Sequence, residues 1–445
     1  MSSTATSVDA GPALGARVPA RGRVAVYCAA FVALGLTTGA LGPTLPGLAA
    51  QARVGVGAAG VLFTARSLGF LLGALGGGRA YDRTRGHPVM AGALGAMALL
   101  LALTPLAAAL WPLALVMLLL GCAEGWLDVG GNTLLTWTHG AQVGPAMNAL
   151  HFAYGVGAAL APVVVARTAA HGGVAPAYWT LALFMLPAAV WLWRVPSPAP
   201  PTIEAPTDET PNARTDGAVY APVDGATPIS VREGVSHTPY RDVARTSSDD
   251  AARTPLVALV AVFFFLYLGV EVGFGGWIYT CAVALGLSGA DGAAYLTAAF
   301  WGALTAGRLL AIPFAARLRP RLLLFVSLVG ALLSLAVVLA AAAPAALWAG
   351  TLGLGLACAS IFPTMMAFAG RHVRLTGRVT GWFLVGASAG GMLVPWLAGR
   401  LFARQGPRAV LALVLLDLCA ALIVFAGLMR AARTSPALTS ARRLR

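Results

Sequence analysis

Long apolar runs separated by short polar segments dominate the chain. A helix that spans a lipid bilayer needs about 20 apolar residues, and most of the runs are close to that length. Two runs are too long for one helix, and the prolines near 105 and 112 and a turn near 341–344 divide them. The pattern predicts twelve spans, over 24–52, 55–78, 89–137 (two spans), 145–166, 174–193, 255–284, 290–316, 322–370 (two spans), 375–398 and 409–429.

The pattern changes over 196–253, which is rich in Pro, Thr, Asp and Ala and has few large apolar residues. Such a segment cannot bury a core, so we predict a disordered linker. The expected organisation is a cytoplasmic tail (1–23), a six-helix bundle (24–195), the linker, a second six-helix bundle (254–430) and another cytoplasmic tail (431–445). The predicted fold class is therefore an all-α integral membrane protein of two six-helix bundles.

Composition supports a membrane protein and excludes a soluble one. Hydrophobic residues make up 58% of the 445-residue chain and charged residues 10%, whereas soluble proteins carry about 25% charged residues. A β-barrel alternates polar and apolar residues and does not produce long apolar runs. We expect the lipid bilayer as the surrounding medium and a monomeric chain.

The net charge of +14 comes from arginine, because the sequence contains no lysine. The arginines lie between the apolar runs, so they indicate membrane topology and not a nucleic-acid partner. With both termini cytoplasmic, 23 of the 30 basic residues fall inside and five outside, while Arg66 and Arg308 remain within spans. This bias, in an Arg-, Ala- and Gly-rich sequence typical of GC-rich bacteria, predicts a multi-pass protein of the inner (cytoplasmic) membrane.

The two halves are also internal repeats. One offset of 233 residues aligns four pairs, which are Thr64 with Thr297, Gly69 with Gly302, Gly157 with Gly390, and Pro162 with Pro395. A constant offset in separate helix pairs indicates duplicated bundles related by an axis along the membrane normal, with a central site between them.

Few acidic residues lie within the spans. A charge in mid-membrane costs about 2.5–3.5 kcal/mol on insertion scales, so each one needs a partner, a cavity or a function. Glu124, Asp128 and Asn132 follow one another at intervals of four in the fourth span and share one helix face. We expect this face to line the central cavity, with Asp128 and Glu124 as coupling carboxylates and Asn132 as a substrate ligand. The alternative for either carboxylate is a buried ion pair, for example with Arg66.

The fifth span opens with Asn148 and His151, one turn apart on one face. We predict that both contact the substrate, because polar groups would converge there. The alternative is that His151 is a packing residue whose hydrogen bonds are satisfied within the bundle.

The seventh span carries Glu271, followed by Trp277 and Tyr279 among several glycines. We predict a coupling role for Glu271 and substrate contact for the two aromatic residues. The alternatives are an ion pair between Glu271 and Arg308 and an interfacial aromatic belt. Asp417 in the last span is expected to be structural.

The segment after the second span, G-G-G-R-A-Y-D-R-T-R-G, resembles the second-loop signature of the major facilitator superfamily. Gly78, Asp82 and Arg83 match the core of that signature, while a glycine follows the basic residues instead of preceding them. In that family the loop locks the two halves through charge contacts, so the resemblance implies a gating loop. A plain cytoplasmic turn is the alternative.

A narrower resemblance covers most of both halves. The segments L-D-V-G-G-N, M-N-A-L-H-F-A-Y-G-V-G-A, Y-L-G-V-E-V-G-F-G-G-W and S-I-F-P-T are similar to the sodium-dependent glucose transporter-like branch of the fucose/glucose/galactose permease family. The resemblance implies a proton- or sugar-linked acid at Asp128 and polar positions at Asn132, Asn148 and His151. Fucose permease also has an acid in its first helix, where this chain has only threonines, so Glu271 is the candidate replacement.

These features predict a cation-coupled sugar symporter that works by alternating access, with H⁺ or Na⁺ as the coupling ion and no other cofactor. Sugar hydroxyls need hydrogen bonds, and polar and aromatic side chains supply the contacts. The alternative is an efflux antiporter for drugs or small metabolites, with a larger and more apolar pocket. A non-transporting sensor fits the duplicated bundles less well. No nucleophile–base pair points to an enzyme, and the five isolated cysteines predict no metal site.

Overall fold

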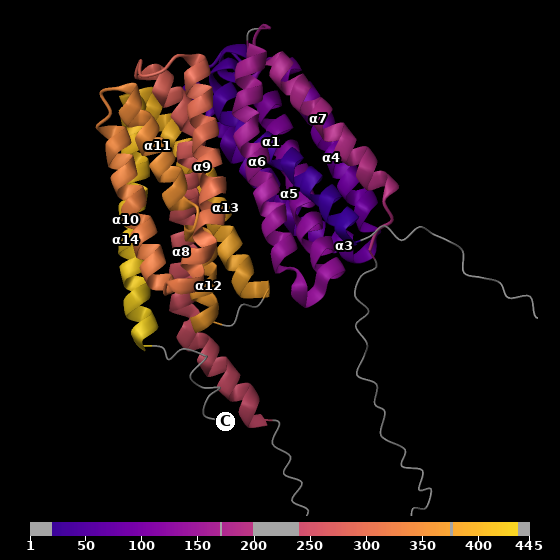
Figure 1. Cartoon of the computed structure of the whole chain (residues 1–445), viewed down its shortest axis with the longest axis vertical. Helices are drawn as coiled ribbons and strands as arrows, with labels where there is room; N and C mark the ends of the chain where they lie inside the picture. The colour runs from indigo at the N-terminus through magenta and orange to yellow at the C-terminus, as the bar shows by residue number, and fades with distance from the viewer. Residues whose placement is uncertain (1–19, 170, 199–239, 374–376, 435–445) are drawn as a thin grey trace, which may run out of the picture.

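The computed structural model describes residues 20–169, 171–198, 240–373 and 377–434, which are almost entirely helical (Figure 1). The first half contains α1 (Ala20–Gln51), α2 (Val56–Ala59), α3 (Val61–Arg83), α4 (Gly86–Leu103), α5 (Leu110–His139), α6 (Gly144–Ala169) and α7 (Ala175–Arg194). The second half contains α8 (Tyr240–Ala284), α9 (Ala290–Arg317), α10 (Pro320–Leu339), α11 (Pro344–Cys358), α12 (Ile361–His372), α13 (Gly377–Gln405) and α14 (Pro407–Thr434).

Twelve helical segments of the described chain are long and apolar enough to cross a membrane, which confirms the predicted number. The breaks also lie where the prolines indicated: a short 3-10 turn over Thr104–Leu106 precedes α5, and residues 340–343 separate α10 from α11. Large apolar side chains such as Trp111, Leu183 and Ile423 are exposed on the outside. Lipid tails are as apolar as these side chains, so such a surface is suited to a bilayer.

The two halves are six-span bundles that lie side by side, with the first half in indigo to magenta and the second in orange to yellow (Figure 1). We call the end at which α8 begins and α14 ends the terminal end, which is the lower end in Figure 1. The opposite end is the far end. Across the interface, α1 packs on α8 and α9, α6 packs on α9, and α2 and α3 pack on α13.

Close glycine contacts inside each half show the internal repeat in three dimensions. In the α1–α6 pair, Gly157 faces the carbonyl oxygen of Val32 and leaves no room for a side chain. In the α8–α13 pair, Gly390 faces the carbonyl oxygen of Phe265 in the same way. Both partners in one half differ from those in the other by 233, as the repeat predicts.

The other helix pair corrects the predicted alignment by one residue. Gly121 of α5 faces the carbonyl oxygen of Arg66 in α3, and Gly355 of α11 faces that of Phe300 in α9. These contacts are related by 234, so the predicted matches of Thr64 with Thr297 and Gly69 with Gly302 are wrong. The second half has one extra residue before α9, so the offset between the α3–α5 pair and the α9–α11 pair is 234. Glycine is so common in this chain that matches such as Gly69 with Gly302 also arise at the offset of 233.

Two segments are more helical than predicted. The predicted linker, 196–253, has residues 199–239 outside the described part of the chain, but α8 begins at Tyr240 and not near 254. Residues 241–254 contain neither Gly nor Pro, so nothing interrupts a helix that enters the seventh span. The predicted gating loop is likewise mostly helix, because α3 continues to Arg83. A helix continues as long as its backbone hydrogen bonds can form, so it can extend beyond the apolar residues that mark a membrane span.

Candidate functional site

A cavity of about 260 Å³ lies between the two halves. The first half lines it from α1, α3, α5 and α6, and the second half from α8, α9, α12 and α13. Most of the wall is apolar or aromatic, including Phe63, Phe70, Trp301 and Phe362. The polar and charged side chains in the wall are Thr38, Arg66, Ser67, Glu124, Tyr154 and Ser388.

A buried ion pair forms the polar centre of this cavity. The guanidinium of Arg66 donates from Nε to Glu124 Oε1 at 3.1 Å, and its Nη2 lies 2.9 Å from each carboxylate oxygen. Nη2 also donates to Thr38 Oγ1 at 2.9 Å. The Glu124 side chain is 1% exposed and that of Arg66 is 14% exposed. The pair therefore keeps both charges compensated away from solvent while Arg66 stays at the cavity surface.

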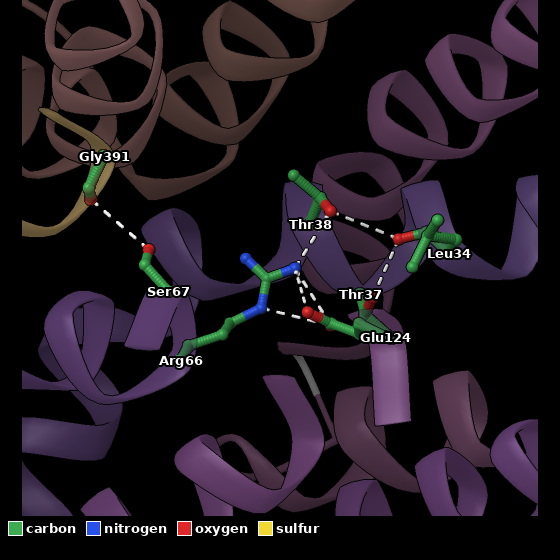
Figure 2. A network of polar contacts seen from close by, with 7 residues as sticks. All are labelled: Leu34, Thr37, Thr38, Arg66, Ser67, Glu124 and Gly391. Carbon is green, nitrogen blue, oxygen red and sulfur yellow. Dashed lines mark hydrogen bonds and ion pairs between the residues drawn. The ribbon is translucent and has the colours of Figure 1, made fainter. Parts of the chain in front are cut away.

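Figure 2 shows Arg66 pointing toward Thr38 and Glu124, which come from two other helices of the same half. The remaining guanidinium nitrogen, Nη1, has no hydrogen bond to a described residue and lies on the side away from Glu124. An ion pair that is only partly satisfied by its own partners can still donate to, and accept from, a polar ligand.

The sequence brings this pair together through small residues. Gly69 and Gly73 of α3 face the backbone of α5, and Gly121 and Gly125 of α5 face the backbone of α3. Any larger side chain at these four positions would separate the two helices. Because the backbones touch, Arg66 can reach the carboxylate of α5 without crossing open space.

The far end of the interface is closed by direct contacts between the halves. Ser67 Oγ donates to the carbonyl of Gly391 at 3.3 Å, also drawn in Figure 2, and Thr64 Oγ1 donates to that of Met392 at 3.0 Å. Farther along, Gly57 of α2 faces the backbone of Gly399 in α13. These contacts leave no space for a ligand to leave the cavity between α2, α3 and α13.

A second contact seals the same end. Phe63 packs on Trp277 with ring centroids 6.4 Å apart, and Trp277 packs on Phe402 at 5.5 Å. The Trp277 indole is fully buried and donates to the carbonyl oxygen of Pro395 at 3.0 Å. Predicted as a substrate ligand, Trp277 has its donor already occupied in this conformation and lies outside the cavity wall.

The three polar residues predicted on one face of the fourth span have different surroundings. Glu124 lines the cavity and forms the ion pair that was its structural alternative. Asp128 and Asn132 are half-buried and lie one and two turns farther toward the terminal end, outside the cavity wall. Asn132 Nδ2 donates to the backbone carbonyl of Asp128 at 2.9 Å. The structure therefore does not bring Asp128 and Arg66 together.

The predicted pair on the fifth span is exposed. Asn148 and His151 both lie on α6, on the terminal side of Tyr154, which does line the cavity. The His151 ring meets the Phe31 ring edge-on at 6.1 Å. Neither Asn148 nor His151 contributes to the cavity wall in this conformation.

Glu271 is buried on α8 next to the cavity wall. The hydroxyl of Tyr267 lies 2.5 Å from Glu271 Oε2 and 2.9 Å from the carbonyl oxygen of Cys358, so it can donate to either. The single ion pair among the described residues is that of Arg66 with Glu124, so the alternative pairing of Glu271 with Arg308 is absent there. Tyr279 is half-buried and outside the wall.

The predicted gating residues are in the second half of α3. Gly78 is half-buried within the helix, and Asp82 and Arg83 are exposed in its last turn. They lie at the terminal end, far along α3 from Arg66.

Sequence reasoning did not assign Thr38, Tyr154 and Trp301 to the site, and it treated Arg66 only as a partner. Arg66 did carry a signal, since it is one of two basic residues within spans. Thr38 and Tyr154 carried none, because single hydroxyl residues are common in membrane helices.

Comparison with known proteins identifies the family to which the chain belongs. Residues 27–395 match the family described as Major Facilitator Superfamily. The sodium-dependent glucose transporter 1A of Mus musculus is 29% identical over 379 residues, which cover 84% of this chain and 88% of that protein.

Two solved structures share the architecture. The nucleoside transporter NupG superposes with a TM-score of 0.67 at 13% identity, over 92% of this chain and 99% of that one. A D-xylose-proton symporter superposes with a TM-score of 0.66 at 14% identity, over 91% and 97%. Identities this low establish a common fold and no common substrate.

Proposed function

This chain belongs to the Major Facilitator Superfamily and is a membrane transporter, not an enzyme, and on that premise we propose that it is a cation-coupled sugar symporter. The observation that carries the proposal is the Arg66–Glu124–Thr38 network in a cavity between the two halves. The relative in Mus musculus is named a sodium-dependent glucose transporter. That name supports a sugar but does not identify which one.

The cavity has the chemistry that a sugar needs. Sugar hydroxyls both donate and accept, and the Arg66–Glu124 pair offers donors and acceptors at one place. Trp301 and Phe63 present aromatic surface in the same wall, and such surface packs against the C–H face of a sugar ring. A cavity of about 260 Å³ holds one small molecule and not a polymer.

The coupling cation is H⁺ or Na⁺, and we propose that it does not bind at Glu124. A cation at that carboxylate would lie next to the guanidinium of Arg66, and like charges at this distance repel. Asp128, one turn away on α5 and free of Arg66, is the better coupling site. Glu271, held by Tyr267, is the second candidate.

The conformation supports alternating access with the far end closed. If the terminal end is cytoplasmic, as the arginine bias predicts, this is a state closed toward the outside of the cell. Asp128, Asn132, Asn148 and His151 then lie along the route between the cytoplasm and the cavity. The membrane would be the bacterial inner membrane, and the chain would work as a monomer.

An efflux antiporter is the second candidate function, and the apolar character of the cavity wall favours it. Most residues around the cavity are apolar, which suits a drug-like compound as well as a sugar face. The buried ion pair favours the sugar, because an apolar ligand would leave Arg66 Nη1 without a partner.

The test is uptake of labelled sugars into vesicles that contain the purified chain, with a Na⁺ or a proton gradient imposed separately. We expect one gradient to drive accumulation and Glu124→Gln to abolish sugar binding. Asp291→Asn, an exposed acid at the start of α9, is the matched control. Binding of lipophilic cations with no sugar uptake under either gradient would favour the antiporter.

A further inference from the structure

An acid outside the central cavity lies unpaired inside the second bundle. Asp417 is on α14, well within a 26-residue span, and its side chain is 9% exposed. It lies on the same helix face as Val410, Val414 and Ala421, which are fully buried. Asp417 therefore faces the bundle interior and not the lipid.

The carboxyl group is in a notch in the surface of α8. The notch exists because residue 269 is glycine: a Cβ there would lie 2.6 Å from Asp417 Oδ2 and 2.6 Å from Val394 Cγ2. Oδ2 is buried and has no hydrogen-bond partner among the residues that the structure describes. The oxygen thus lies beside the Gly269 backbone and near a Val394 methyl group, and an apolar methyl group cannot stabilise a negative charge.

The helices that pack on α14 supply no counter-charge. They are α8, α10 and α13. On α8, the titratable residues near this depth are Tyr267 and Glu271, which interact with each other and with Cys358 of α11 on a different side of the helix. Apart from Asp417, the charged residues of α10, α13 and α14 lie toward helix ends, and they are Arg321, Arg378, Arg400, Arg404, Arg408, Arg430 and Arg433.

An ionised carboxylate in such a place is strongly disfavoured, whereas a neutral carboxylic acid is tolerated. We propose that Asp417 is a proton-binding site, occupied in this conformation and separate from the central cavity. The ligand is H⁺ alone, because Na⁺ requires several oxygen ligands and the notch offers only the carboxyl group itself.

The site is placed to affect the cavity. Gly269, which forms the notch, is the neighbour of Leu268, and Leu268 and Val272 line the cavity from the same helix. Loss of the proton would leave a charge in the α8–α14 contact, and the two helices would have to separate or admit water. Proton occupancy at Asp417 is therefore linked to the position of α8.

Infrared spectroscopy of the full-length protein in lipid membranes tests the proposal directly. At neutral pH we expect the carbonyl stretch of un-ionised carboxylic acid, with the intensity of one group lost in Asp417→Asn and in Asp417→Leu. Asp82→Asn, which changes an exposed acid at the end of α3, should leave the band unchanged. Two substituted residues are used so that poor folding of one does not prevent the test.

Thermal unfolding gives a second readout that needs no substrate. The neutral acid fits the notch and the ionised acid does not, so the stability it permits is present at low pH and lost as pH rises through deprotonation. Between about pH 5 and about pH 9, the wild-type melting temperature should fall more than that of Asp417→Asn. Equal falls in both proteins, or a carboxylic acid band that persists in both Asp417 variants, would overturn the proposal.

Discussion

At the scale of single residues, the membrane interior decides what each charged side chain does. Arg66 and Glu124 compensate each other, and Glu271 has a hydroxyl partner in Tyr267. Asp128 has no cation partner among the described residues and no place in the cavity wall. A carboxylate that the fold leaves without a counter-charge can bind and release a cation during the transport cycle, which is why we assign coupling to Asp128.

We predict that Asp128→Asn abolishes gradient-driven accumulation and preserves sugar binding or exchange. The substitution keeps size and removes the charge that would hold the cation. One charge moving through about 100 mV supplies roughly 2.3 kcal/mol, which sustains accumulation on the order of 50-fold. Vesicle uptake measures this directly. If the variant still concentrates sugar with the same ion dependence, Asp128 is not the coupling residue and Glu271→Gln is the next variant to test.

We predict that the Arg66–Glu124 pair contributes to the free energy of unfolding. Removing one partner leaves a buried charge uncompensated, so Glu124→Gln should lose about 3–5 kcal/mol of unfolding free energy. The double variant Arg66→Gln with Glu124→Gln should recover much of that loss, because neither charge remains. Chemical denaturation in detergent compares the two. Neither variant should bind sugar, and a single variant as stable as the wild type would contradict the assignment.

At the scale of helices, glycine contacts set which elements touch. Inside each half they fix the α3–α5 and α8–α13 pairs, and between the halves they allow α2 to lie on α13. Most contacts within a bundle are kept when a rocking-bundle transporter changes state, whereas those between bundles at the closed end must separate. The far-end contact of Gly57 with Gly399 belongs to the second kind.

We predict that Gly57→Val opens the far end. A Cβ at Gly57 would collide with the Gly399 carbonyl oxygen and lie 2.7 Å from the Ala403 side chain. Spin labels at Ala58 and Gln405, both exposed, should report a longer distance in the variant, with uptake strongly reduced. Gly55→Val is the matched control, since nothing lies within 4 Å of its Cβ position. Equal distances in both variants would show that this contact does not hold the closed state.

At the scale of the molecule, most residues of each hydrophobic core belong to one bundle. The bundles meet across a smaller interface of α1, α2, α3 and α6 with α8, α9 and α13. Each half therefore carries most of its own packing energy. Rigid-body movement of one half against the other is consistent with this division.

We predict that most of the segment between Pro198 and Tyr240 can be deleted without loss of transport. It is polar and poor in residues that form a core, so its main requirement is to be long enough to connect α7 with α8. Chains that lack residues 205–235 should insert normally and retain uptake close to the wild-type rate. Failure of transport in a correctly inserted, shortened chain would show that the segment has a role of its own.

The number of spans and the duplicated design could both be predicted from the amino-acid sequence alone. Both follow from patterns along the chain. An apolar run long enough to cross a bilayer must be a helix, and a duplicated bundle leaves residue matches at a nearly constant offset in the sequence. It also singled out the charged residues of the spans, because each is costly in lipid wherever it lies. Part of the candidate site, namely Glu124 and its possible partner Arg66, was therefore predictable.

Which of these residues contact one another depends on how the helices pack, and this could not be predicted from the sequence. Glu124 and Asp128 share one face of α5, but Asp128 lies one turn farther toward the terminal end. The depth at which α3 places Arg66 therefore brings Glu124 into the ion pair and leaves Asp128 outside the cavity. Close backbone contacts at Gly121 and Gly355 set the true repeat offset in that helix pair, which differs by one residue from the offset that matching letters favoured. Trp277 seals the far end instead of lining the cavity, since its surroundings come from α3 and α13. Such contacts join segments far apart in the chain, and no local pattern of polarity records them.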